Sequence, residues 1–212
     1  LALADGAASN TPFSDGSATI EPWVATLRAH MMPNGVEEAL ADADLALEQL
    51  PPDSFWIPTA LLGQGVAHTL LGADDRAVME LSATIERGLA AGSFEEVFLA
   101  HAQLGLLAAK EGAWGEAGRR ARAAEAVVEE TGLGDYSSAA LVHVATARVA
   151  LHEARPQEAR AALARVHRLR PLLDQGIPWV TVEVGLELTR IHLGLGEAAA
   201  AKRARLGQRT GQ

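Results

Sequence analysis

Helical patterns of apolar and polar residues alternate with short breakers along most of the chain. Residues 5–18 differ, because they are rich in Gly, Ser, Asp and Pro and lack periodicity, which predicts a loop. Leu1 to Ala4 are typical of the end of a helix, which indicates a piece of a longer protein. We therefore expect a short segment over 1–18 and a single helical domain over 19–212. The predicted helices are 19–32, 35–50, 54–71, 74–91, 94–111, 114–131, 136–153, 156–170, 177–195 and 197–208.

A breaker followed five residues later by alanine recurs along the chain. The pairs are Asn34/Ala39, Gly72/Ala77, Gly112/Ala117, Ala154/Ala159 and Gly196/Ala201. Successive alanines are 38, 40, 42 and 42 residues apart. Seven residues before each of the last four breakers stands a small or fairly small residue: Gly65, Gly105, Ala147 and Thr189. This self-similarity predicts a repeated helix pair.

Repeated helix pairs have a physical reason to stack. Two antiparallel helices joined by a tight turn bury one face against each other and a second face against the next pair. Small residues are needed where the axes approach most closely, and glycine ends a helix in the left-handed conformation without a Cβ penalty. The sequence therefore predicts an all-α solenoid of about five helix hairpins. The alternative is an irregular helical bundle whose glycines recur by coincidence.

Composition supports helices and narrows the function. Apolar residues make up 49% of the chain and aromatic residues only 4%, with alanine, the best helix former, dominating the apolar set. The net charge of −9 leaves no cationic surplus for a nucleic acid, so we expect no direct nucleic-acid contact. The chain has no cysteine for a disulfide or zinc ribbon, and no apolar run reaches the roughly 18 residues of a membrane span. A cytoplasmic protein without membrane contact is the expectation.

The repeat phase carries a family resemblance. Gly65…Gly72…Ala77 and Gly105…Gly112…Ala117 resemble the tetratricopeptide repeat, although the spacing exceeds its usual period of about 34 residues. Lengthened repeats of this kind are similar to the helical repeat region of large LuxR-type, MalT-like bacterial transcriptional regulators. The phrases that carry this likeness include LLGQGVAHTLLGADDRAV (61–78), AHAQLGLLAAKEGAWGEAGRRARAA (100–124) and PWVTVEVGLELTRIHLGLGEAAAAK (178–202).

That resemblance implies a tetratricopeptide-like α-α superhelix that binds a small-molecule inducer or a regulatory protein and is not itself an enzyme. Such regulators also carry a nucleotide-binding module and a helix-turn-helix. Neither is visible here, since the sequence has no G-x-x-x-x-G-K-[ST] loop and no basic recognition helix after residue 208. We expect DNA binding from a separate C-terminal domain. A stand-alone scaffold for protein–protein interaction and a His–Glu hydrolase stay open as alternatives, as does a homodimer.

The first helix of each pair lines the concave side of such a superhelix, and its groove-facing positions are the candidate binding residues. They combine apolar side chains with a few polar ones, as ligand grooves do. Arg148 and Arg190 suit an anionic ligand or a peptide carboxylate, and the alternative is an ion pair such as Arg148 with Glu183. The candidates are Thr59, Leu62, Val66, Ala102, Leu106, Lys110, Arg148, His152, Glu183 and Arg190.

Two sequence motifs that could indicate catalysis or cofactor binding lack the neighbouring residues or secondary structure that those functions need. Gly194-x-Gly196-x-x-Ala199 matches the loosest dinucleotide-binding pattern, but a predicted helix precedes it where a strand is needed. His152-Glu153 begins like a zinc-protease helix, but Pro156 stands where the second histidine is required. We therefore expect no catalytic residue, no cofactor and no metal.

Histidines and tryptophans supply the remaining candidates. His101 and His143 share one phase of successive repeats, and packed imidazoles explain them more simply than a metal site does. Trp56, Trp114 and Trp179 follow turns or prolines, so we expect them to cover the core between helix pairs. Ligand contact is the alternative for these tryptophans.

Overall fold

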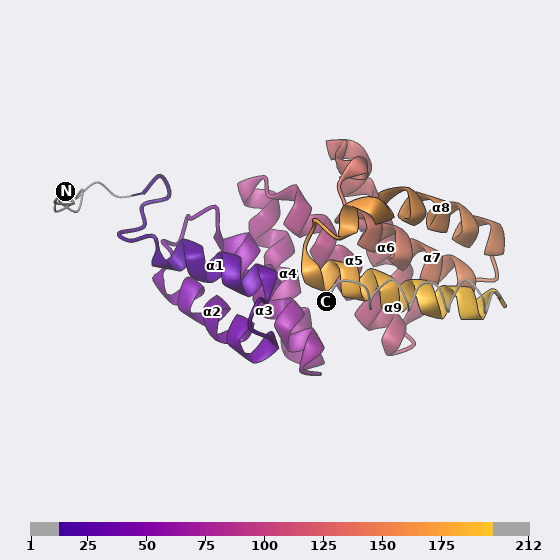
Figure 1. The fold of residues 1–212 in the computed structure, drawn as a ribbon, viewed down its shortest axis with the longest axis horizontal. Coiled ribbons are helices and arrows are strands. Elements are labelled where there is room, and N and C mark those ends of the chain that lie inside the picture. Colours follow the sequence, from indigo (N-terminus) through magenta and orange to yellow (C-terminus); the bar gives the residue numbers. More distant parts are fainter. Residues whose placement is uncertain (1–12, 197–212) are drawn as a thin grey trace, which may run out of the picture.

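The computed structural model describes residues 13–196, and the regular secondary structure in that range is entirely helical. Helices α1 and α2 lie at one end of the long axis of the molecule, and α5 to α9 lie together towards the other end, with the start of α9 near the middle (Figure 1). They are α1 (Glu21–Met31), α2 (Val36–Gln49), α3 (Ile57–Leu70), α4 (Asp74–Ala91), α5 (Phe94–Lys110), α6 (Trp114–Thr131), α7 (Ala139–His152), α8 (Pro156–Leu173) and α9 (Pro178–Gly194), with one 3-10 turn at Leu133–Asp135. The all-α prediction is confirmed for this part of the chain.

Each helix predicted between residues 19 and 195 is present, and the differences lie at the ends. The prediction that one helix stops at residue 170 is wrong, because α8 continues through Pro171 to Leu173. Proline lacks an N–H and so loses one helical hydrogen bond, but Leu173 is buried in the core and holds the last turn. The segment 13–18 contains no helix, as predicted. The helices expected at 1–4 and 197–208 lie outside the described residues.

The helices form two rows. The odd-numbered helices pack on one another in order, α1 on α3, α3 on α5, α5 on α7 and α7 on α9. Each even-numbered helix packs against the odd-numbered helix before it and the one after it, and α8 contacts α9 only weakly. Helix α5 is consequently buried nearly all round, whereas α6 buries only a stripe that includes Ala117, Ala121, Ala124 and Val128. The main core lies between the two rows.

The recurrent alanines and turns occupy equivalent places in successive helix pairs. Ala39, Ala77, Ala117 and Ala159 are at most 2% exposed, so each lies inside a helix crossing. The breakers Gly72, Gly112 and Gly196 adopt left-handed φ angles of 76°, 77° and 74°. Ala154 takes the same turn with φ 57° despite its Cβ. Because Ala154 keeps this strained left-handed conformation without being glycine, we infer that the packing of the flanking helices determines the geometry of the turn. Ala201, the last alanine of the series, lies outside the described residues.

None of the described helices has the length and apolar character needed to span a membrane.

Gly65 provides a test of the close helix packing. A Cβ built on Gly65 would lie 2.8 Å from Cγ of the fully buried Leu81, so Gly65→Ala should force one helix of the pair to shift. We expect it to lower the free energy of unfolding by about 1 kcal/mol in urea titrations, since overpacking outweighs the better helix propensity. Gly115→Ala is the matched control, because the nearest atom is the flexible Arg119 Nη1 at 3.8 Å. A loss in the control as large as that of Gly65→Ala would contradict the packing explanation.

Candidate functional site

The row of odd-numbered helices curves until its ends meet. The His30 ring near the end of α1 lies nearly perpendicular to the Trp179 ring at the start of α9, with 6.5 Å between ring centroids. Figure 1 shows the start of α9 beside the end of α1. Burial lowers the pKa of His30 to about 4, so this imidazole is neutral at neutral pH. Helices from the two ends of the described chain thus border one hollow.

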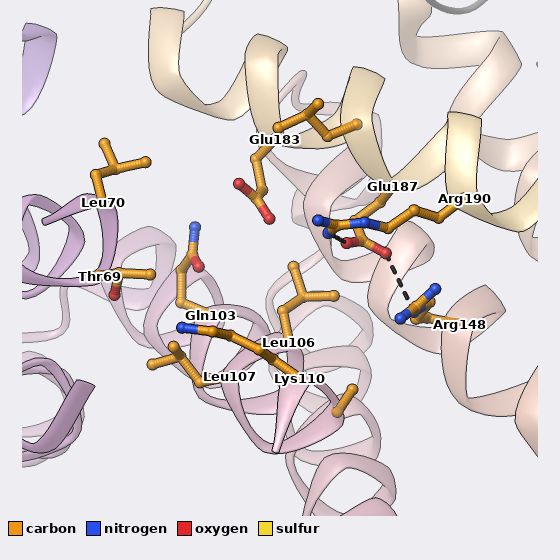
Figure 2. Close-up of a pocket in the computed structure, with 12 residues that line it drawn as sticks. Thr69, Leu70, Gln103, Leu106, Leu107, Lys110, Arg148, Glu183, Glu187 and Arg190 are labelled. Atoms are coloured by element: carbon orange, nitrogen blue, oxygen red, sulfur yellow. Dashed lines mark hydrogen bonds and ion pairs between the residues drawn. The ribbon is translucent and has the colours of Figure 1, made fainter. Parts of the chain in front are cut away.

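Two adjoining cavities occupy this hollow, with volumes of about 230 Å³ and about 430 Å³. They share five lining residues, Thr69, Leu70, Gln103, Glu183 and Leu186, and therefore form one groove. Figure 2 shows the larger cavity, with α3 and α5 on one side and α7 and α9 on the other. Sequence reasoning had placed a groove along the odd-numbered helices, which is where these cavities lie.

The smaller cavity is mainly apolar. Four of its side chains are large hydrophobic residues that remain exposed: Met31, Leu70, Val182 and Leu186. Val66, Trp179 and Met32 complete much of the wall. Apolar surface gathered in a concave site is typical of ligand and partner binding. Glu183 is the one charged residue that lines this cavity.

The larger cavity contains ion pairs built around Glu187. This carboxylate is only 2% exposed and pairs with Arg148 at 3.4 Å and with Arg190 one helical turn away (Figure 2). Lys110 at the end of α5 pairs with Asp74 at 2.6 Å. The three cations that line the cavity are thus held by two carboxylates, since Arg148 and Arg190 share Glu187. The alternative of an ion pair between helices is therefore confirmed for Arg148, but its partner is Glu187 and not Glu183.

Arg148 is held from a second direction by an aromatic stack. Its guanidinium carbon lies 5.9 Å from the centroid of the Trp114 ring, within the range of a cation–π contact. The other ring in this stack is His152, which lies parallel to Trp114 at 3.8 Å. The stack fixes the direction from which Arg148 reaches Glu187.

Glu183 is the carboxylate of the groove that lacks such a partner. It makes no hydrogen bond or ion pair within the described part of the chain, and its side chain faces the groove near Gln103 (Figure 2). Burial raises the pKa of Glu183, the negative charge of Glu187 raises it further, and Arg190 lowers it. The ionised form of Glu183 is therefore poorly stabilised.

Six of the ten candidate groove positions line the cavities: Val66, Leu106, Lys110, Arg148, Glu183 and Arg190. The other four do not. Leu62 and Ala102 are fully buried in the core, and Thr59, 8% exposed, donates a hydrogen bond to Glu96 at 2.7 Å. His152 is exposed at the end of α7, outside both cavities. The prediction that these residues line the groove is wrong because each odd-numbered helix packs against neighbours on several sides. The face of the helix that remains open to the groove is therefore narrower than the position in the repeat indicates.

Several groove residues were missed by sequence reasoning. Glu187 precedes Arg190 by three residues, a spacing that favours a helical ion pair and could have identified it. Gln103, Leu70 and Leu186 gave no such signal. Met31 contributes only because the end of α1 approaches α9, a contact that no local pattern predicts.

The remaining candidate chemistry is sparse. Among the described residues, no group of three or more histidine, aspartate or glutamate side chains is placed to hold a metal ion. Burial, with nearby arginine charge, lowers the pKa of both His101 and His143 to about 4, as expected for packed neutral imidazoles. Trp114 packs against the core, and Trp179 both packs there and lines the groove.

Comparison with known proteins does not identify the chain: no family model, curated protein or solved structure matches it.

Removing the charge of Glu187 tests the ion-pair centre. Glu187→Gln should lower the free energy of unfolding by about 1–2 kcal/mol, because it leaves Arg148 and Arg190 without the buried negative charge that they share. Arg190→Gln should lower it by less than about 1 kcal/mol, because the Arg190 side chain is 55% exposed and Arg148 still holds Glu187. Chemical denaturation measures both, and equal losses would contradict the central role of Glu187.

The raised pKa of Glu183 predicts a pH-dependent stability. The folded protein holds this proton more tightly than the unfolded chain does, so wild-type stability falls as pH rises above 4.5 through the raised pKa. Glu183→Gln removes that loss. The variant should therefore melt at a higher temperature than the wild type at about pH 7.5, and the gain should vanish below pH 4.5. A gain that is the same at both pH values would show that ionisation of Glu183 is not its source.

Proposed function

We propose that this chain is a tetratricopeptide-like helical-repeat segment of a LuxR-type transcriptional regulator and binds a ligand in its groove without catalysing a reaction. The observation that carries the binding role is the groove itself, in which exposed apolar side chains adjoin fixed polar groups. The ligand is a small-molecule inducer or a segment of a regulatory protein.

The arrangement of the helices supports the superhelical repeat. The odd-numbered helices form one continuous row, and each even-numbered helix packs against the odd-numbered helices before and after it, as expected for stacked hairpins. Three buried alanines, Ala77, Ala117 and Ala159, each stand five residues after a left-handed turn. Stacked hairpins present their inner helices to a shared concave surface, and here that surface contains the groove.

The polar groups of the groove support binding over catalysis. A hydrolase of the His–Glu kind needs its base and its acid within reach of the same substrate atom. Glu183 lines both cavities, whereas His152 lies outside them and stacks on Trp114. Arg148 and Arg190 are held by Glu187 and so serve as fixed, positioned groups.

The regulatory role rests on the sequence resemblance, and the closed groove suggests how binding would be transmitted. A ligand in the smaller cavity contacts Met31 on α1 and Val182 on α9 at once. Such a ligand favours the closed form over any form in which α1 and α9 separate, which is the differential affinity that a switch requires. The gene that encodes this chain should then also encode a phosphate-loop module upstream and a helix-turn-helix downstream.

Filling the groove tests the proposal directly. Leu186 lines both cavities and is 43% exposed, so Leu186→Trp should occupy the space without entering the core. In a thermal-shift screen of metabolites and peptides, compounds that raise the melting temperature of the wild type should fail to stabilise this variant. Met79→Trp is the matched control, since Met79 lies on α4 and is 72% exposed, and it should respond like the wild type.

Compounds that stabilise Leu186→Trp as strongly as the wild type would place binding elsewhere and contradict the proposed groove. An encoded protein that lacks both flanking modules would contradict the regulator and favour the stand-alone scaffold.

A further inference from the structure

One carboxylate of the groove, Glu183, lies apart from the ion pairs that hold the other charges. Glu183 is the one charged residue lining the apolar cavity, and it makes no hydrogen bond or ion pair in the described part of the chain. The ionised form of a carboxylate is destabilised when the group is removed from water without a hydrogen-bond or ion-pair partner. A protein that keeps such a group facing a cavity leaves its charge available to a ligand.

The cations of the groove make their ion pairs with other carboxylates, although the charge of Arg190 lowers the pKa of Glu183. Lys110 is paired with Asp74 at 2.6 Å. Arg148 and Arg190 both pair with Glu187, and Arg148 also contacts the ring of Trp114. All three line the larger cavity and none lines the apolar one. An anionic ligand that filled the apolar cavity would place its charge beside Glu183, which repels it.

The walls around Glu183 suit a particular kind of ligand. Met31, Val182 and Leu186 present exposed apolar surface to the same cavity. Trp179 adds an aromatic ring, whose face attracts cations. Gln103, 3% exposed, contributes a polar amide on the opposite wall, near Glu183 (Figure 2). Apolar surface surrounding one free carboxylate is complementary to a molecule with an apolar body and one positive charge.

We propose that the ligand of this groove is an organic cation with an apolar body, whose ammonium group pairs with Glu183 while its body fills the cavity between α1, α3 and α9. This inference rests on the proposed groove binding and adds the chemical class of the ligand. Binding supplies the opposite charge that Glu183 lacks and removes exposed apolar surface from water.

Binding should strengthen as pH rises through the raised pKa of Glu183. The other charged groups that line the cavities are Glu187 and Arg190 on α9, Arg148 on α7 and Lys110 on α5, and His30 on α1 contacts the ring of Trp179, which lines the apolar cavity. His30, with its pKa near 4, stays neutral above that pH, and the side chains that α3 contributes to the cavities do not titrate. An alkylammonium keeps its charge up to about pH 10. Glu183 is therefore the group whose ionisation changes the affinity.

Three probes with the same chain and different head groups test the charge preference: octylammonium, octanoate and 1-octanol. Isothermal titration calorimetry on the full 212-residue chain at about pH 7.5 should show octylammonium binding at least about tenfold more tightly than the other two. Glu183→Gln should weaken octylammonium by about tenfold and leave 1-octanol within about twofold. Glu130→Gln, a carboxylate exposed on α6, is the matched control and should change nothing.

The possible outcomes distinguish failure of the cation preference from failure of the proposed binding in the groove. The cation preference would be overturned if octanoate or 1-octanol bound as tightly as octylammonium. If Leu186→Trp abolished that binding, the groove would still be the binding site. Octylammonium binding that Glu183→Gln leaves unchanged would also overturn the preference. If Leu186→Trp leaves the binding of every probe and of the screened compounds unchanged, the proposed groove itself fails.

Discussion

Everything in this structure depends on how closely the odd-numbered helices can approach their neighbours. Helices such as α3 and α5 are packed by other helices on several sides, so positions at the crossings hold glycine or alanine. At Gly65 even a single added carbon would meet Leu81. The same closeness lets the row curve tightly enough for α1 to reach α9. Without it the hollow between those helices would be an open, shallow face.

The curvature also sets the chemistry of the groove. Because α7 and α9 lie side by side, Arg148 from one helix reaches Glu187 on the other, and Arg190 supplies a second positive charge. Such a buried carboxylate is tolerated only when cations match it. Glu183, one turn earlier on α9, faces the cavity instead of a neighbouring helix and has no such match. Two glutamates four residues apart therefore have different roles: one fixes helices and the other is available to a ligand.

This arrangement connects binding to the shape of the whole array. The groove is bordered by helices from the two ends of the described chain, so its occupant stabilises a contact between distant segments. In a solenoid, contacts are otherwise mostly between successive repeats, and small changes at each junction add up along the row. In the proposed sensor, a ligand that joins the two ends changes the shape of the row through these junctions.

The sequence by itself determined the helices, their pairing and the turns, because these depend on local spacing: the buried alanines and the left-handed breakers recur about every forty residues. It also identified Arg148, Glu183 and Arg190, since the phase of a repeat places residues on the inner helix. Only the tertiary structure decided that Leu62 and Ala102 lie in the core, that Glu187 is the partner of both arginines and that Met31 meets Val182 across one cavity. Those outcomes depend on the angle at which each helix pair stacks on the next. That angle is the sum of many side-chain contacts, so no local pattern in the sequence contains it.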